Sequence, residues 1–386
     1  MVLQSRKEYL LSIKERYLSS SKKQKKLILD EFCAVCGYNR KYACRILNQR
    51  KQPPKKKPGR KPIYLPILLN HLKKLWLDTG QMCSKKFIAA IPIWLPFYEQ
   101  EYGLLEPLIK QQLLKISSAT IDRILKKVRA SSQPNGLCAT KPGSLLKNQI
   151  PIRTEFWDVN TPGFVEADTV ALCGNSLAGA FVWALTLTDI HTTWTEIRAV
   201  WTKGAPGIVC AINDIQSHLP FRLRGFDCDN GSEFLNECLV TYFSGESNKD
   251  IAFTRSRPYK KNDNAHVEQK NYTHVRQLLG YDRYENPKLV ELINDLCINA
   301  WSPYQNFFCP ALKLKSKIRI NSKYIKTYDN AKTPYQRILE SENIPDGKKN
   351  ELKAKFNSLN PFTLKKSIEH KLKIIFTMLR DTKTIS

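Results

Sequence analysis

Three acidic residues stand where metal-dependent chemistry would need them. Asp168 lies inside the apolar run FVEADTV, where an ionised carboxylate is unfavourable unless it is paired or bound to a cation. Asp229 ends another apolar run and precedes Asn-Gly, a dipeptide typical of tight turns. Glu268 lies in KKNDNAHVEQKN, at the start of a predicted helix. Three carboxylates in one pocket would repel one another, and divalent cations remove that repulsion.

Carboxylates of this kind point to phosphoryl chemistry. Mg²⁺ takes oxygen ligands, typically one or two carboxylates together with substrate phosphate. Two ions about 4 Å apart stabilise both the attacking and the leaving oxygen of an in-line displacement. A basic rim around the acids suits an enzyme that holds a polyanion. The nucleic-acid contacts predicted around Glu268 are Arg257, Lys260, Lys261, Lys270 and Asn271.

Two further acids compete with the first two. Asp227 lies two residues before Asp229, so both side chains share a strand face, but the Asp-Asn-Gly motif favours Asp229. Glu166 lies two residues before Asp168 and is expected at most to support it.

Other candidate ligands have structural explanations. Asp189 is expected to cap a turn, and Glu233 to lie in the first turn of a helix, where an acid is normal. His266 is expected at the surface, or as a group that tunes activity. Cys33 and Cys36 form a CxxC pair with no second pair and no histidine nearby, which favours structural cysteines over a zinc site.

Composition indicates a polyanionic partner. The chain has 386 residues, with 62 Lys+Arg against 35 Asp+Glu and a net charge of +27. Nucleic acid fits this charge best, and an anionic membrane surface is the alternative. Residues 87–98 form the most apolar run, which is too short to span a bilayer, and the first residues lack signal-peptide features. We therefore expect a cytoplasmic, nucleoid-associated protein with reduced cysteines.

The first segment, residues 1–50, predicts a helix-turn-helix. Its helical periodicity breaks at Gly37, and Asn39 is a plausible cap for a second helix over residues 40–48. The expected buried residues are Leu27, Ile28, Phe32, Val35, Tyr42, Ile46 and Leu47. The expected DNA contacts are Arg40, Lys41 and Arg45. An ordinary basic helical hairpin is the alternative.

A basic, proline-rich linker over residues 51–63 follows, in which Arg60 and Lys61 suit a DNA groove. Residues 64–130 predict a second helical DNA-binding region. Its last helix has Ser118 as cap and Arg123 and Lys126 on the outer face. The apolar stripe of that helix is Ile121, Ile124, Leu125 and Val128. Residues 131–155 are a second linker, rich in Ser, Pro and Gly.

The pattern then changes to that of a mixed α/β domain over residues 156–303. Predicted strands cover residues 164–172, 180–190, 193–200, 221–229 and 250–257, and predicted helices cover 205–219, 233–243 and 263–280. Three meandering strands followed by alternating helices and strands give a mixed five-stranded sheet, in which the first and fourth strands can be neighbours. A small basic region, residues 304–386, completes the chain, with short strands and then helices over 344–379.

These motifs together resemble a known family. The strand aspartate, DNGSEF and RPYKKNDNAHVEQKN resemble the catalytic core of retroviral-integrase-type DDE transposases of bacterial insertion sequences. The resemblance covers roughly residues 157–284, and GYDRY and TPYQRIL also suit it. It implies an RNase H-like fold with Asp168, Asp229 and Glu268 as the catalytic and metal-binding triad. The His/Cys zinc domain of retroviral relatives has no counterpart, and helix-turn-helix helices replace it.

The resemblance implies a transposase that binds Mg²⁺ or Mn²⁺, as two ions, and acts on double-stranded DNA as a homo-multimer. It would cut the ends of its element with water and then join the freed 3′-hydroxyl to target DNA. Two alternatives stay open: an RNase H-like nuclease without strand transfer, and an inactive DNA-binding descendant of a transposase.

Overall fold

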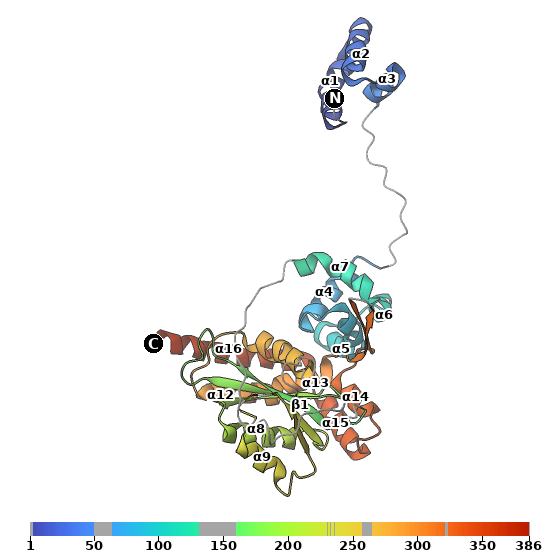
Figure 1. The fold of residues 1–386 in the computed structure, drawn as a ribbon. Helices are drawn as coiled ribbons and strands as arrows, with labels where there is room; N and C mark the ends of the chain where they lie inside the picture. Colours follow the sequence, from blue (N-terminus) through green and yellow to red (C-terminus); the bar gives the residue numbers. More distant parts are fainter. Residues whose placement is uncertain are drawn as a thin grey trace. The chain divides into compact units, whose positions relative to one another are not determined.

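The computed structural model describes residues 3–49, 64–130, 160–229, 231, 233–234, 236–256, 265–320 and 323–385. The predicted DNA contacts Arg60, Lys61, Arg257, Lys260 and Lys261 lie outside these residues, as do the side chains of Glu268 and His266. The chain divides into two compact units, Met1–Ile63 and Tyr64–Ser386. Figure 1 labels their helices and strands.

The first unit consists of α1 (Leu3–Ser19), α2 (Lys22–Cys36) and α3 (Arg40–Asn48). The left-handed backbone of Gly37, at φ 67°, ends α2, and its N–H donates to the Cys33 carbonyl. The Asn39 side chain accepts from the Lys41 N–H at 2.9 Å and starts α3. The predicted helix break and cap are confirmed.

The predicted buried face of this unit was partly wrong. Ile28, Phe32 and Leu47 are buried, and Ile46 is half-buried, as expected. The side chains of Leu27, Val35 and Tyr42 are exposed instead. The contacts in α2 centre on Ile28, Leu29, Phe32 and Cys36, and those in α3 on Ala43 and Leu47. Neighbouring positions on a helix lie about 100° apart, so one residue of offset turns a side chain outward.

The second unit begins with four helices: α4 (Leu68–Asp78), α5 (Ser84–Tyr102), α6 (Pro107–Lys115) and α7 (Ser118–Ala130). In α7, Ile121 and Leu125 are fully buried, as predicted, and Ile124 and Val128 pack partly against the core. The cap is Ser117, not Ser118, because its hydroxyl accepts from the Thr120 N–H.

One hydrophobic core joins these helices to the C-terminal part of the chain. Trp94 of α5 is fully buried and donates its indole N–H to the Phe308 carbonyl at 2.9 Å. The same core includes Leu72 near the start of the unit and Leu379 near its end. No helix among the described residues combines the length and apolarity that crossing a membrane requires.

The central sheet contains β1 (Phe164–Ala171), β2 (Val182–Asp189), β3 (Thr195–Trp201), β4 (Gly225–Cys228) and β5 (Ala252–Arg255). Its order is β3-β2-β1-β4-β5. Pairs β1–β2 and β2–β3 are antiparallel, whereas β1–β4 and β4–β5 are parallel. The mixed five-stranded sheet and the contact between the first and fourth strands are therefore confirmed.

Helices cover both faces of this sheet (Figure 1). On one face lie α8 (Ala205–His218) and α9 (Glu237–Ser244), and the predicted inner residues Ile208, Ala211, Ile212 and Ile215 of α8 are buried there. The other face is covered by a run of helical segments: α10 (Ala265–Lys270), η1 (Asn271–Arg276), α11 (Gln277–Leu279), α12 (Lys288–Leu296), η2 (Cys297–Trp301) and α13 (Ser302–Phe308).

After α13 the chain forms a hairpin of β6 (Leu314–Ile320) and β7 (Lys323–Tyr328). It ends in α14 (Pro334–Glu340), α15 (Asp346–Ser358) and α16 (Pro361–Ile385). The short strands and helices expected here are present. Their buried residues, including Ile338, Leu352 and Ile375, belong to the same hydrophobic core as α4–α7.

Two asparagines close the β3 edge of the sheet. The side-chain amide of Asn306 bonds both the N–H and the C=O of Thr195, each at 3.0 Å. Asn294 does the same at Ala199, at 2.7 and 3.0 Å. Each amide occupies the hydrogen-bonding groups that an added strand would use, so α12 and α13 cover an otherwise open edge.

We predict that Asn306→Ala lowers the free energy of unfolding by about 2 kcal/mol, because it leaves two buried backbone groups unpaired. Denaturant titration measures this loss. Asn299→Ala is the matched control, since Asn299 is exposed and its side-chain amide donates to Asp295 and not to a strand. Equal stabilities of the two variants would contradict this role of Asn306.

Candidate active site

The carboxyl ends of β1, β3, β4 and β5 lie at one end of the sheet, because these strands run in the same direction. In open α/β sheets, ligands bind outside the carboxyl ends of the strands, at the point where the connections from two neighbouring strands run in opposite directions. Here that point is between β1 and β4, since β2 flanks β1 on its other side.

Asp168 and Asp229 meet at this point. Ala167 is paired with Cys228, the last residue of β4, so Asp168 is the next residue of β1 and Asp229 is the first residue after β4. Parallel neighbours lie about 4.8 Å apart, and residues in register point to the same face. Sheet pairing alone therefore brings two residues 61 positions apart in sequence side by side.

Asp168 is held by two donors. Its Oδ1 accepts from the Thr169 N–H at 2.7 Å, and its Oδ2 accepts from the Asn271 side-chain amide at 2.6 Å. Asn271 begins η1, directly after α10. The helix that contains Glu268 is therefore tied to Asp168, and Glu268 itself lies in α10, three residues before Asn271.

Asp229 lies in a tight turn with a second acid. Its Oδ1 accepts from the Gly231 N–H at 2.8 Å. A Cβ on Gly231 would lie 2.8 Å from that oxygen and 2.7 Å from Oε1 of Glu233, so both carboxylates converge on this glycine. Burial raises the pKa of Asp229 to about 6, and the Glu233 carboxylate adds to the rise, while Lys203 opposes it.

Glu233 was predicted to lie in the first turn of a helix, and this prediction was wrong. The helix begins at Glu237, because the Asn236 side chain accepts from the Leu239 N–H and caps it. Glu233 lies in the preceding turn and is buried, and its Oε1 accepts from the Thr169 hydroxyl at 2.7 Å. It therefore connects β1 to the turn that contains Asp229.

The two competing acids lie deeper in the fold. Glu166 is paired with Asp227 in the sheet, and both are buried. Glu166 accepts from the Val267 N–H at 3.2 Å and so anchors α10, whereas Asp227 accepts from the Thr254 hydroxyl at 2.6 Å. These contacts support structural roles for both.

Asp189 caps a turn, as predicted. It accepts from the Gly163 N–H at 2.8 Å and from both the N–H and the hydroxyl of Thr192 at 2.6 Å. Its carboxylate therefore joins the loop after β2 to Gly163, the residue before β1.

The predicted DNA contacts differ in their surroundings. Arg123 and Lys126 are exposed on α7. Lys270 is half-buried, and its amine lies 3.3 Å from Nε2 of His274. Burial and the nearby charge of Lys86 lower the pKa of Lys270 to about 7. Lys270 thus lies partly inside the fold, unlike Arg123 and Lys126.

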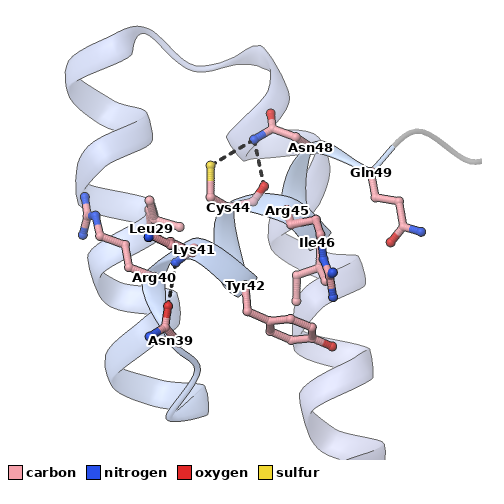
Figure 2. A pocket seen from close by; sticks show the side chains of 10 residues that line it. All are labelled: Leu29, Asn39, Arg40, Lys41, Tyr42, Cys44, Arg45, Ile46, Asn48 and Gln49. Carbon is pink, nitrogen blue, oxygen red and sulfur yellow. Dashed lines mark hydrogen bonds between the residues drawn. The ribbon is translucent and has the colours of Figure 1, made fainter.

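In the first unit, an open groove of about 1210 Å³ runs along α3 (Figure 2). Arg40, Lys41 and Arg45 line it together with Tyr42. The Arg45 guanidinium lies 5.1 Å from the centre of the Tyr42 ring, and Arg40 is paired with Asp30 of α2. Lys41 and Arg45 therefore present their charges on the exposed side of α3.

The described residues around Asp168 and Asp229 fit a hard divalent cation. The donors there are oxygens, which Mg²⁺ and Mn²⁺ prefer. Oδ1 of Asn271 is a buried acceptor without a hydrogen-bond partner among the described residues. Among the side chains that the structure describes, which exclude that of Glu268, no group of three or more His, Cys, Asp and Glu is arranged to hold an ion.

Comparisons with known proteins identify one family. The chain is 37% identical over 335 residues to the uncharacterized protein y4rM of Sinorhizobium fredii (strain NBRC 101917 / NGR234), a match that covers 86% of this chain and 95% of y4rM. The chain therefore belongs to the family of y4rM. No family model matches it.

Several solved structures are distantly similar. The simian T-cell lymphotropic virus intasome in complex with PP2A regulatory subunit B56 gamma matches with a TM-score of 0.32 and 13% identity, over 64% of this chain and 74% of that chain. The HTLV-2 integrase catalytic core domain in complex with magnesium matches with a TM-score of 0.28 and 16% identity, over 39% and 90%. The catalytic core domain of BIV integrase matches with a TM-score of 0.29 and 15% identity, over 47% and 95%. At these scores, the function has to be inferred from the chain itself.

We predict that Gly231→Ala leaves the fold intact but displaces the Asp229 and Glu233 carboxylates, because its Cβ would meet the flexible ends of both side chains. Thermal melts with and without Mn²⁺ measure the effect, since a bound ion stabilises the folded state. The wild type should melt at a higher temperature with Mn²⁺, and Gly231→Ala should lose most of that shift.

Gly245→Ala is the control, because its Cβ would come no closer than 3.4 Å to its neighbours. A full Mn²⁺ shift in Gly231→Ala would show that this turn does not shape a cation site.

Proposed function

We propose that the protein is a DDE transposase that cuts DNA ends and transfers the strands by metal-dependent phosphoryl transfer. The observation that supports this most is the register of β1 with β4, which places Asp168, inside β1, beside Asp229, the first residue after β4. The helix of Glu268 is bonded to Asp168 through Asn271. Three carboxylates far apart in sequence thus lie on elements that meet near the carboxyl ends of β1 and β4.

In this proposal, Asp168, Asp229 and Glu268 would hold two Mg²⁺ or Mn²⁺ ions, which would supply Lewis-acid chemistry to the attacking hydroxyl and the phosphate. The chain itself supplies orientation. The Thr169 N–H and Asn271 fix both oxygens of Asp168, and the Gly231 N–H fixes one oxygen of Asp229. Prearranged ligands avoid reorganisation during the reaction.

The remaining features support a DNA substrate. The net charge of +27 favours a polyanion, and the exposed basic face of α3 suits recognition of double-stranded DNA. We propose that residues 1–50 and 64–130 bind the element ends, that 51–63 and 131–155 connect the domains, and that 156–303 is the catalytic domain. Residues 304–386 form a basic C-terminal region. Pairing of two DNA ends requires a homo-multimer, which would associate with the nucleoid.

We predict that Asp168→Asn, Asp229→Asn and Glu268→Gln each abolish strand transfer while DNA binding survives, because each removes an ion ligand. The assay uses DNA with the flanking ends of the element, with Mg²⁺ or Mn²⁺, and detects joined products. Asp250→Asn is the control, since Asp250 forms an exposed ion pair with Arg222.

Joined products from Asp168→Asn or Asp229→Asn would contradict the proposal. Cleavage without joining by the wild type would instead identify an RNase H-like nuclease. DNA binding without either reaction would identify an inactive descendant that only binds DNA.

A second prediction concerns α3. Lys41→Ala and Arg45→Ala should each weaken binding to the element ends and lower the salt dependence of log K by about one unit for each phosphate that is no longer bound. Arg40→Ala should have a smaller effect, because Arg40 already pairs with Asp30. Titrations of the full chain at several salt concentrations test this, and three equal effects would argue against a specific role of this face.

A further inference from the structure

Lys203 reaches the candidate active site from a third strand. It lies two residues after the end of β3. This strand runs parallel to β1 and β4 and therefore ends at the same end of the sheet. Its amine lies 3.4 Å from Oε2 of Glu233 and 5.1 Å from the centre of the Trp183 ring. Glu233 and Trp183 thus fix a cation beside the turn that contains Asp229.

The backbone before Lys203 is strained. Thr202 has φ 58°, in the left-handed region that a β-branched residue rarely adopts. Such a conformation costs about 1–3 kcal/mol and persists only where surrounding contacts impose it. The Thr202 N–H donates to the carbonyl of Phe181, the residue before β2, at 3.1 Å, which holds the strained residue in place. Strain of this kind gathers at functional sites.

Lys203 and Glu233 differ in how much of each side chain is exposed to solvent. The Glu233 side chain is 7% exposed, and its other oxygen already accepts from Thr169. The Lys203 side chain is 44% exposed. A charge-assisted hydrogen bond is typically about 2.7–2.9 Å long, and a lysine amine has three donors. The Glu233 contact is longer than that, so it orients the amine without saturating it.

We propose that Lys203 binds a phosphate of the DNA strand at the active site, with Glu233 and Trp183 positioning its amine. This inference rests on the proposed function. The acids near the carboxyl ends of β1 and β4 would repel a phosphodiester, and a fixed ammonium group beside them offsets that repulsion. Lysine is a common phosphate ligand that acts as a point charge.

The test is a double-mutant cycle between Lys203→Met and single uncharged methylphosphonates placed around the cleaved bond. Lys203→Met should lower kcat/KM roughly ten- to a hundredfold, the loss expected for one charge-assisted hydrogen bond. One methylphosphonate should reduce the rate of the wild type but have no further effect in Lys203→Met, because both changes remove the same interaction. Lys203→Arg should retain most activity.

Lys249→Met is the matched control, since Lys249 is an exposed lysine paired with Glu246. Thermal melts establish that each variant is folded. Additive losses at every methylphosphonate position, or equal activities of Lys203→Met and Lys249→Met, would overturn the inference.

A purely structural role for Lys203 predicts a different result. If Lys203 only neutralised Glu233, Lys203→Met with Glu233→Gln would recover activity, whereas a phosphate ligand stays lost in the double variant. Asp229→Asn in the same assay separates the two proposals. An active Asp229→Asn defeats the proposed function, whereas an inactive one with a normal Lys203→Met defeats only this inference.

Discussion

The parallel pairing of β1 with β4 sets the position of every other part of the candidate site. Its register, Ala167 against Cys228, places Asp168, inside β1, beside Asp229, the first residue after β4. The same register places Glu166 against Asp227 one step deeper, where backbone and hydroxyl donors satisfy them. A shift of one residue would move one acid of each pair to the opposite face of the sheet.

Hydrogen bonds between elements then fix what surrounds this pair. Glu166 holds the start of α10 through Val267, and Asp168 holds the start of η1 through Asn271. Thr169 reaches Glu233 on the other side. Consecutive residues of β1 thus bind the helix on one face and the Asp229 turn on the other. Asn294 and Asn306 bond β3 and so close that edge of the sheet.

The sequence predicted most of the elements, because strands rich in Val, Thr and Phe and helices such as Ala205–His218 have clear periodic patterns. It did not predict the role of Glu233, since an acid before a helix cap resembles an acid in the first helical turn. The Asn236 cap places Glu233 before the helix. The sequence signal for its role was its short distance from Asp229, with Gly231 between them. The roles of Lys203 and Asn306 depend on contacts between distant strands and helices, which no local pattern contains.

The central claim is that Asp168 and Asp229 share a divalent cation. The most direct measurement is Mn²⁺ binding by electron paramagnetic resonance, in the wild type and in Asp168→Asn and Asp229→Asn. If the register of β1 and β4 builds the site, each single substitution should weaken Mn²⁺ binding at least roughly tenfold, because the ion loses a charged ligand. Wild-type affinity in either variant would show that the two carboxylates do not hold a common ion.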